Sequence, residues 1–321
     1  MSNRTLAQVC QRIVRECLAL NRDERCLLIK DLEPFELASN LETAINTSGG
    51  IAQVLEIPTE VYMHEPLPKS VEPAMTSADV VLLCTKELFP HKARRLAAEA
   101  GARVLSLGTV TKEMALRALD VDYDELARVT KSVADAYARA EEVRMTTRAG
   151  TDVRMMITSQ PVHSFDGLAR ERGKTSALPA GVVATLPLPG TAEGIVVLDG
   201  SIASIGLLKN PITLTVKEGR VTDIQGGEEA DKLLRTLNAA DANARCVIEV
   251  GMGTNPRAAY VGNLVEDERV RGSGHIGLGR NVQLGGTIES KVHLDATLRE
   301  PSIYLDGKVI VNEGKLLIGG K

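Results

Sequence analysis

Hydrophobic positions in the first part of the chain alternate between helical spacing and short continuous runs. Residues 5–20 and residues near 34–48 carry apolar side chains at close to the helical period, and the second segment stops at Gly49. Four short apolar runs predict buried strands at 26–29, 52–57, 80–84 and 103–107. Alternation of strands with helices is typical of a parallel, doubly wound sheet with right-handed crossovers.

The pattern changes after a charged, Ala-rich helix predicted near 122–142. Residues 142–157 alternate like two strands around a Gly turn, and one helix is expected at about 228–238. Further strand-like runs occur at 194–198, 212–216, 221–224, 247–250, 303–305 and 309–311. The predicted fold is therefore an α/β, doubly wound parallel-sheet domain at residues 1–142, followed by a β-rich α+β metal-site domain at residues 143–321.

Composition narrows the functional classes. The 321 residues are 44% hydrophobic and 25% charged, as in ordinary globular proteins, and the net charge of -4 argues against nucleic acid as the main partner. No run approaches 18 apolar residues, so we expect no membrane span. Arg12 and Arg15 interrupt the apolar residues near the start, so this segment is not expected to be a signal peptide. The five cysteines are scattered, and Cys10, Cys17, Cys84 and Cys246 lie within apolar patterns, which favours buried free thiols and a cytoplasmic location.

Motifs of other enzyme classes are missing. No G-x-G-x-x-G follows the first predicted strand, and no G-x-x-x-x-G-K-[ST] occurs, which disfavours a nucleotide-binding role for the first domain. No G-x-S-x-G is present, and no cysteine has a histidine nearby in sequence. The first domain is better interpreted as a scaffold or a dimer-forming domain.

The most informative short segment is His293-Leu294-Asp295, which has the alternation of a strand. Side chains at positions i and i+2 of a strand project from one face, about 6.6 Å apart. An imidazole and a carboxylate on one face can hold one metal ion. The alternative interpretation is a packed histidine beside a surface aspartate.

Two further residues extend this candidate site. His275 lies in a glycine-rich segment, 272–279, which could equally be a loop with an incidental histidine. Glu249 lies near the end of an apolar strand, where a buried charge needs a partner, unless the strand end emerges into solvent. Glu249, His275, His293 and Asp295 together predict a site with two histidines and two carboxylates for Zn²⁺, Mn²⁺ or Fe²⁺.

Other polar residues give weaker signals. A general base could be supplied by one of three carboxylates, and their spacing does not choose among Glu266, Asp267 and Glu289. The basic run at 170–174 is more typical of a solvated loop than of a clamp for an acidic substrate. Three more histidines are expected to be surface, packed or pocket-lining residues: His64, His91 and His163.

The second half of the chain resembles the aminopeptidase T family of metallopeptidases. The resemblance covers most of 143–321 and, more loosely, the first domain; its carriers are Leu178-Pro179-Ala180-Gly181, 191–200, 249–256, 274–279 and 293–295. It implies that the four candidate residues fall on ligands of a two-metal centre and that the protein is a homodimer. Where the family has Pro-x-Gly-Glu, this chain has Val182, which counts against a second metal and against peptidase activity.

The chain also resembles the 2,5-dihydroxypyridine 5,6-dioxygenases, mononuclear non-haem iron enzymes that open a pyridine ring. The similar segments are 226–230, 293–299 and 303–306. In this resemblance Glu249 takes the place of the remaining iron-binding histidine, and the aromatic substrate loop becomes Phe165–Pro179, which holds a single aromatic residue.

Three functions follow as alternatives. The favoured one is a metal-dependent hydrolase, in which a metal-activated water attacks an amide or peptide bond of a peptide or small-molecule substrate. The second is a ring-cleaving iron dioxygenase with ligands drawn from His275, His293 and Asp295. The third is a binding protein with a degraded site, which would hold no stoichiometric metal.

Overall fold

The computed structural model describes residues 4–33, 35–62 and 67–319. The chain forms two compact units, the first made of Met1–Ala127 with Phe165–Ala180, and the second of Arg128–Ser164 with Gly181–Lys321. These units differ from the contiguous ranges 1–142 and 143–321 in two ways. Residues 128–142 belong to the second unit, and a short strand within 165–180 returns to the sheet of the first unit.

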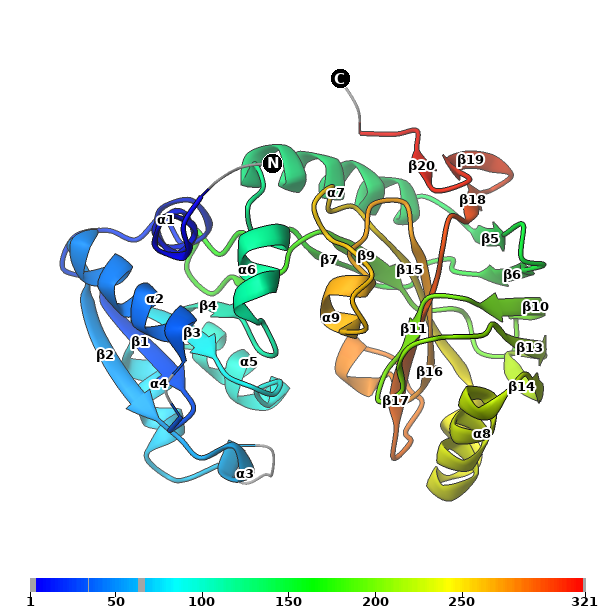
Figure 1. Ribbon diagram of the computed structural model, residues 1–321, viewed down its shortest axis with the longest axis horizontal. Helices are drawn as coiled ribbons and strands as arrows, with labels where there is room; N and C mark the ends of the chain where they lie inside the picture. The colour runs from blue at the N-terminus through cyan, green and yellow to red at the C-terminus, as the bar shows by residue number, and fades with distance from the viewer. Residues whose placement is uncertain (1–3, 34, 63–66, 320–321) are drawn as a thin grey trace. The chain divides into compact units, whose positions relative to one another are not determined.

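The first unit is built on a five-stranded parallel sheet (Figure 1). Its strands are β1 (Arg25–Lys30), β2 (Ile51–Glu56), β3 (Val80–Cys84), β4 (Arg103–Ser106) and β8 (Thr175–Ala177). They lie in the order β2-β1-β3-β4-β8, and every neighbouring pair is parallel. The four predicted apolar runs form the first four strands, whereas β8 lies in a segment expected to be a loop.

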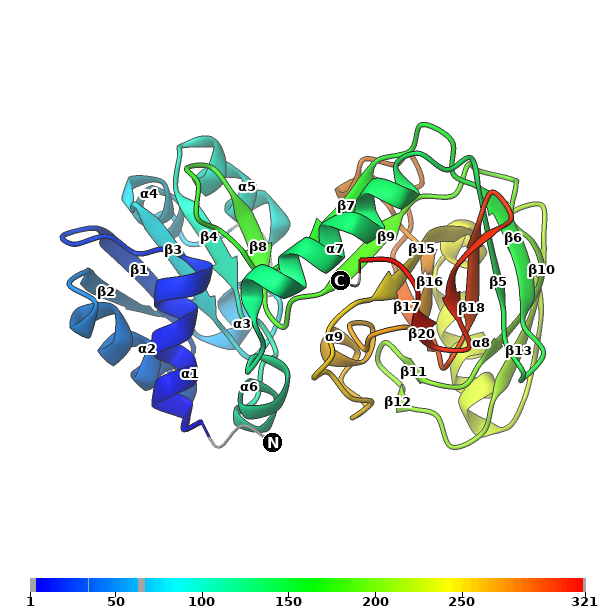
Figure 2. The same cartoon turned by 90° about the horizontal axis from the view of Figure 1, so that it is seen from above.

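Helices cover both faces of this sheet, as a doubly wound fold requires (Figure 2). α1, α2 and α6 pack against one another, and α4 packs on α5. Their bounds are α1 (Leu6–Arg12), α2 (Glu36–Thr47), α3 (Thr59–Tyr62), α4 (Val71–Ser77), α5 (His91–Glu99) and α6 (Lys112–Ala118). The single helix expected at 5–20 is wrong in detail: α1 passes into a π-helical turn, Ile13–Cys17, where the Leu18 N–H donates to the Ile13 carbonyl at 3.1 Å.

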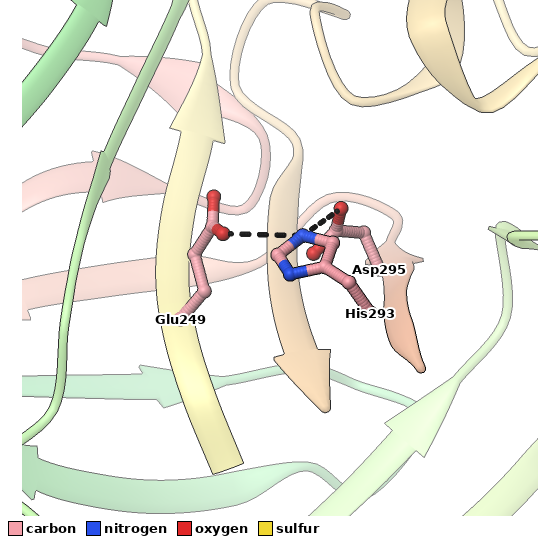
Figure 3. Close-up of side chains that lie close together, drawn as sticks. All are labelled: Glu249, His293 and Asp295. Carbon is pink, nitrogen blue, oxygen red and sulfur yellow. Dashed lines mark hydrogen bonds and ion pairs between the residues drawn. The ribbon is translucent and has the colours of Figure 1, made fainter. Parts of the chain in front are cut away.

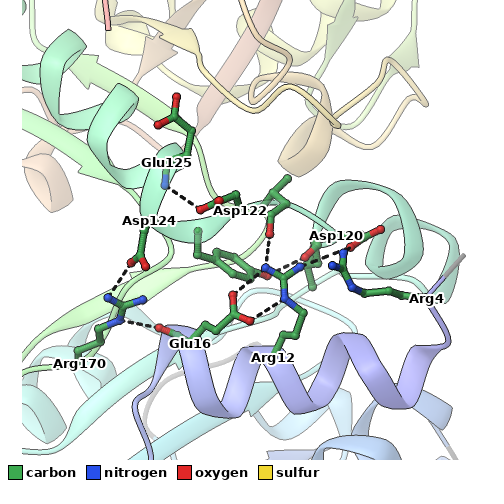
Figure 4. Close-up of polar contacts among 11 residues, drawn as sticks. Arg4, Arg12, Glu16, Asp120, Asp122, Asp124, Glu125 and Arg170 are labelled. Carbon is green, nitrogen blue, oxygen red and sulfur yellow. Dashed lines mark hydrogen bonds and ion pairs between the residues drawn. The ribbon is translucent and has the colours of Figure 1, made fainter. Parts of the chain in front are cut away.

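A network of charged side chains holds α1 against the segment that follows α6 (Figure 4). Arg12 pairs with Glu16 one turn later, donates to the Val121 carbonyl at 2.6 Å, and lies 5.6 Å above the Tyr123 ring. It also pairs at 3.4 Å with Asp120, whose side chain is buried. The network therefore links residues that are more than a hundred positions apart.

The second unit contains two sheets. The eight-stranded sheet is antiparallel in the order β14-β13-β10-β6-β5-β18-β19-β20, and the seven-stranded sheet has the order β12-β11-β17-β16-β15-β9-β7. The strands of the first are β5 (Glu142–Thr146), β6 (Asp152–Met156), β10 (Glu193–Leu198), β13 (Ile212–Lys217), β14 (Arg220–Gln225), β18 (Ser302–Leu305), β19 (Lys308–Asn312) and β20 (Lys315–Leu316). Those of the second are β7 (Val162–Phe165), β9 (Val182–Thr185), β11 (Ser201–Ile202), β12 (Gly206–Leu207), β15 (Val247–Gly253), β16 (Gly274–Gly279) and β17 (His293–Leu298).

One hydrophobic core joins the inner faces of the two sheets. It includes Val153 and Val196 from the eight-stranded sheet and Val250, Ile276 and Leu294 from the seven-stranded sheet. Because side chains alternate along a strand, the residues between these core positions on β15, β16 and β17 point to the opposite face. That opposite face of the seven-stranded sheet carries all four candidate metal ligands.

The predicted fold class is confirmed, with a parallel sheet covered by helices and a separate antiparallel, β-rich part. α7 (Tyr123–Tyr137) ends before the expected 142, α8 (Glu228–Ala240) is the predicted helix of the second half, and α9 (Leu264–Asp267) was not expected. The five cysteines are free and buried, as their apolar surroundings predicted. Among the described residues, no helix has both the length and the hydropathy needed to cross a membrane.

Candidate metal centre

Three adjacent strands bring a glutamate and an aspartate into one row. In the sheet register Glu249 of β15 pairs with Gly277 of β16, and Gly277 pairs with Asp295 of β17. His293 lies two residues before Asp295 on β17 and pairs with Gly279. All three polar side chains therefore project from the same face, as the alternation around His293 predicted.

The three side chains converge (Figure 3). Glu249, His293 and Asp295 each offer one ligand atom, and these atoms lie within 4.8 Å of one another. The His293 Nε2 atom is 3.0 Å from Asp295 Oδ2 and 3.5 Å from Glu249 Oε2. Glu249 is buried, and the other two residues are partly buried. A carboxylate–imidazole–carboxylate set of this size can hold a divalent cation.

Gly277 makes this convergence possible. A Cβ atom at this position would lie 2.7 Å from Asp295 Oδ1 and 2.8 Å from the Glu249 Cβ. Both distances are shorter than real Cβ contacts, so any side chain here would displace one of the two carboxylates. The middle strand must therefore have glycine between the two acidic residues.

His275 belongs to the next row of the same face but is not one of the three converging residues. It is fully buried, its Nε2 lies 3.4 Å from Glu249 Oε1, and neither ring nitrogen has a hydrogen bond of normal geometry within the described chain. Gly251, its partner on β15, leaves room for the ring, since a Cβ there would lie 2.5 Å from Nε2. His275 therefore contacts the centre through Glu249.

The two carboxylates dominate the electrostatics of the imidazoles. Burial lowers the pKa of His293, but the charge and hydrogen bond of Asp295, together with Glu249, outweigh this effect and raise the pKa to about 10. The same competition between burial and nearby carboxylates raises the pKa of His275. Without a metal, the row therefore attracts positive charge, which is the condition for binding a cation.

The outer nitrogen of His293 is held by the loop that precedes β17. His293 Nδ1 donates to the Arg280 carbonyl at 2.7 Å, and the Gln283 amide group lies 2.9 Å from the same nitrogen. This contact leaves Nε2 directed at the two carboxylates, as in metal sites where the second ring nitrogen bonds to a carbonyl. No sequence motif identified Arg280 or Gln283 as contacts of His293.

The three carboxylates considered as general bases have other partners. Glu266 and Asp267 are fully buried and accept backbone N–H groups, Glu266 from Ala259 and Asp267 from Val261 and Gly262. They brace the loop before α9. The exposed Glu289 lies 3.3 Å from Arg280. None of the three is among the converging residues.

The remaining polar candidates do not join the row either. His163 Nε2 lies 2.8 Å from the Leu284 carbonyl, and Arg170 pairs with Asp124 at 2.8 Å. His64 lies outside the described residues, as does the side chain of His91. Val182 of β9 pairs with Gly253 and places an apolar side chain where the peptidase pattern has a carboxylate.

Comparisons with known proteins give a consistent result. The family model for NicX, described as 2,5-dihydroxypyridine 5,6-dioxygenase, matches residues 56–318. A curated relative of that name from Pseudomonas putida KT2440 is 28% identical over 261 residues, covering 76% of this chain and 72% of its own length.

Two solved structures share the fold. The 2,5-dihydroxypyridine dioxygenase of Pseudomonas putida KT2440 is similar with a TM-score of 0.85 at 22% identity, covering 99% of this chain and 98% of that one. Wild-type AmpT from Thermus thermophilus has a TM-score of 0.69 at 16% identity, covering 98% of this chain and 99% of that one. The predicted resemblance to the aminopeptidase T superfamily, with its dioxygenase branch, is thereby confirmed.

The favoured functional prediction is wrong. A metal-dependent hydrolase acting on peptide bonds was preferred, but the family match and the curated relative both support the dioxygenase alternative. The peptidase is the more distant structural neighbour. The loss of a carboxylate at Val182 is consistent with this correction.

Proposed function

Because the chain belongs to the NicX family, described as 2,5-dihydroxypyridine 5,6-dioxygenase, we propose that it is an iron-dependent dioxygenase that opens a small hydroxylated aromatic ring. The observation that carries the proposal is the convergence of Glu249, His293 and Asp295 within a chain of this family. The family match covers all three residues. We further propose that 2,5-dihydroxypyridine is the first substrate to test.

The residues present fit a divalent cation. Two carboxylates and a neutral imidazole balance its charge, and Asp295 Oδ1 is buried without a hydrogen-bond partner in the described chain. Ring-opening iron sites commonly use two histidines and one carboxylate. Here Glu249, His293 and Asp295 supply the converging set, and His275 lies beside Glu249 as a second imidazole. Iron, when bound, supplies the redox chemistry that lets dioxygen react with the ring.

The protein's own residues would hold the ligands of the cation in place. Gly277 leaves room for the Glu249 and Asp295 side chains, and Gly251 leaves room for the His275 ring, because a Cβ atom at either position would meet these groups at less than 3 Å. The two glycines therefore let the strands hold both carboxylates and the imidazole close together. The Arg280 carbonyl accepts a hydrogen bond from His293 Nδ1, so a neutral His293 would present an unprotonated Nε2 to a cation.

The reaction is balanced without a further reductant. In a ring-opening dioxygenation both atoms of dioxygen enter the product as one ring carbon–carbon bond breaks. The electrons that reduce dioxygen come from that bond and from the hydroxylated ring. A partly shielded site suits such chemistry because it limits side reactions with water; Glu249 and His275 are both buried.

The proposal is tested by oxygen uptake with the full chain, purified anaerobically and loaded with Fe²⁺. We expect 2,5-dihydroxypyridine to cause oxygen uptake by the wild type, and expect Asp295→Ala to lose both stoichiometric iron and uptake. Asp223→Asn, which removes an exposed carboxylate on β14, is the matched control and should behave as the wild type. Substrate consumption without oxygen, or full activity in Asp295→Ala, would refute the proposal.

A further inference from the structure

A cavity with several charged side chains in its wall lies in the second unit, away from Glu249, His293 and Asp295, which we call the metal row. Its volume is about 690 Å³, and its wall includes Tyr260, Ser273 and Arg299. Arg299 follows Asp295 by four residues, which corresponds to about 13 Å along a strand. His275 and Thr297, which pair between the two places, are fully buried and are not part of the wall. The Arg299 cavity is therefore separate from the metal row.

Two polar groups in this wall are incompletely satisfied. Arg299 Nε and Ser273 Oγ are both inaccessible to solvent, and neither has a hydrogen bond of normal geometry to a described residue. The Tyr260 hydroxyl interacts with the Ser273 side chain. Arg299 and Ser273 are also neighbours: Ser273 precedes β16, Arg299 follows β17, and the strand pair ends with Gly274 opposite Leu298. Buried polar groups are almost always satisfied, so two adjacent exceptions at one cavity point to a ligand.

Arg299 is held in a fixed orientation. Its guanidinium carbon lies 4.6 Å from the centre of the Tyr260 ring, and the Tyr260 hydroxyl donates to the Leu298 carbonyl at 3.1 Å. Asp199 interacts electrostatically with the Arg299 guanidinium, but the described part of the chain contains no direct ion pair between the Arg299 side chain and a carboxylate. A guanidinium stacked on an aromatic ring keeps its N–H groups in one plane, which suits the two oxygens of a planar anion.

The charge around the cavity favours a singly charged anion. Arg148 and Glu313 pair with each other at 2.9 Å, and the Asp199 carboxylate accepts the backbone N–H of Arg299 at 2.7 Å. Beyond the first pair, the wall carries three basic and two acidic side chains: Arg271, Arg299, Lys315, Asp199 and Glu300. The acidic residues would repel a dianion more strongly than a monoanion.

We propose that the Arg299 cavity binds a small carboxylate, whose oxygens accept hydrogen bonds from the Arg299 guanidinium and the Ser273 hydroxyl. Such a ligand satisfies both buried groups at once. A planar carboxylate matches the guanidinium fork, whereas phosphate carries more negative charge and is tetrahedral. This site is additional to the metal row and does not depend on the function proposed for it.

The test is calorimetric titration of the full chain with benzoate and, separately, with inorganic phosphate. We expect benzoate to bind more tightly than phosphate, Arg299→Met to weaken benzoate binding about 10–100-fold, and Ser273→Ala to weaken it about 2–10-fold. Arg148→Met is the matched control, because Arg148 lies in the same wall but already has a partner. It should bind benzoate like the wild type.

Two further measurements keep the result decisive. Asp295→Ala should bind benzoate normally, which separates this cavity from the metal row. If Arg299→Met melts well below the wild type, the benzoate affinity of Ser273→Ala alone tests the proposal, because this variant leaves the Arg299–Tyr260 contact in place. No benzoate binding by the wild type, tighter binding of phosphate, or unchanged benzoate affinity in Ser273→Ala would each overturn the proposal.

Discussion

Gly277→Ala should damage the metal site while leaving the fold in place. Gly277 has no positive φ, so alanine adds no backbone strain, and the effect comes from the new methyl group alone. That methyl would lie 2.7 Å from Asp295 Oδ1 and 2.8 Å from the Glu249 Cβ. The Cβ is tied to the backbone of β15, whereas the Asp295 carboxylate can rotate, so Asp295 should give way.

The expected magnitudes separate binding from stability. Displacing one ligand by a neighbouring change should weaken metal binding about 10–100-fold, as outer-shell changes typically do. Overpacking one methyl group should lower the free energy of unfolding by about 1–3 kcal/mol. Metal affinity is measured by anaerobic titration with Fe²⁺, and the free energy of unfolding by urea denaturation of the metal-free protein.

Gly274→Ala is the matched control on the same strand. Its side chain would point to the opposite face, toward the flexible end of Met145 at 3.2 Å and Pro301 at 3.3 Å. We expect a similar or smaller loss of stability and unchanged metal affinity. If Gly277→Ala binds Fe²⁺ as tightly as the wild type, the row formed by Glu249 and Asp295 is not the metal site.

Three other predictions concern single residues. Glu249→Gln should lose iron, whereas Glu249→His, which gives the site two histidines and one carboxylate, should retain more iron. Metal analysis of both variants measures the iron content, and equal iron contents would count against Glu249 as a ligand. The metal-free His293, with a pKa of about 10, holds a proton at neutral pH that a cation must displace. Metal affinity should therefore rise with pH up to about 10, and each binding event should release a proton. Calorimetry in buffers of different ionisation enthalpy measures this release, and binding without proton release would contradict the prediction. Arg12→Met should lower the free energy of unfolding by about 1–3 kcal/mol, because buried Asp120 loses a partner. The control Arg95→Met removes an exposed ion pair and should lower it by less than about 0.5 kcal/mol. Urea denaturation measures both changes, and equal losses would refute the argument.

Local patterns were sufficient for the parts of the fold that depend on neighbouring residues. The apolar runs of the first unit predicted its parallel strands, and the alternation of Val292, Leu294 and their polar neighbours placed His293 and Asp295 on one face. The histidine and aspartate of the candidate site could therefore be proposed without any knowledge of the fold.

Long-range pairing could not be predicted in the same way. The glycine-rich segment around His275 could be a loop, and it became strand β16 because β15 and β17 pair with it on both sides. The position of Gly277 between Glu249 and Asp295 depends on that register. The return of β8 to the first unit is a pairing of the same kind, between residues about seventy positions apart.

The chemistry of the site was the hardest part to predict. Glutamate, histidine and aspartate ligands suit both a metallohydrolase and an iron dioxygenase, so the ligand types alone do not separate the two. The match across residues 56–318 favours the dioxygenase. The homodimer, the cytoplasmic location and the roles of Glu249, His275, His293 and Asp295 as metal ligands stay predictions.

The central claim is most directly tested by the origin of the product's oxygen atoms. The Fe²⁺-loaded protein would be given 2,5-dihydroxypyridine under ¹⁸O₂ in unlabelled water, and the product would be examined by mass spectrometry. We predict that both labelled atoms enter a ring-opened product, and that Asp295→Ala forms none. A product carrying oxygen from water alone, or one formed equally well without dioxygen, would contradict the account.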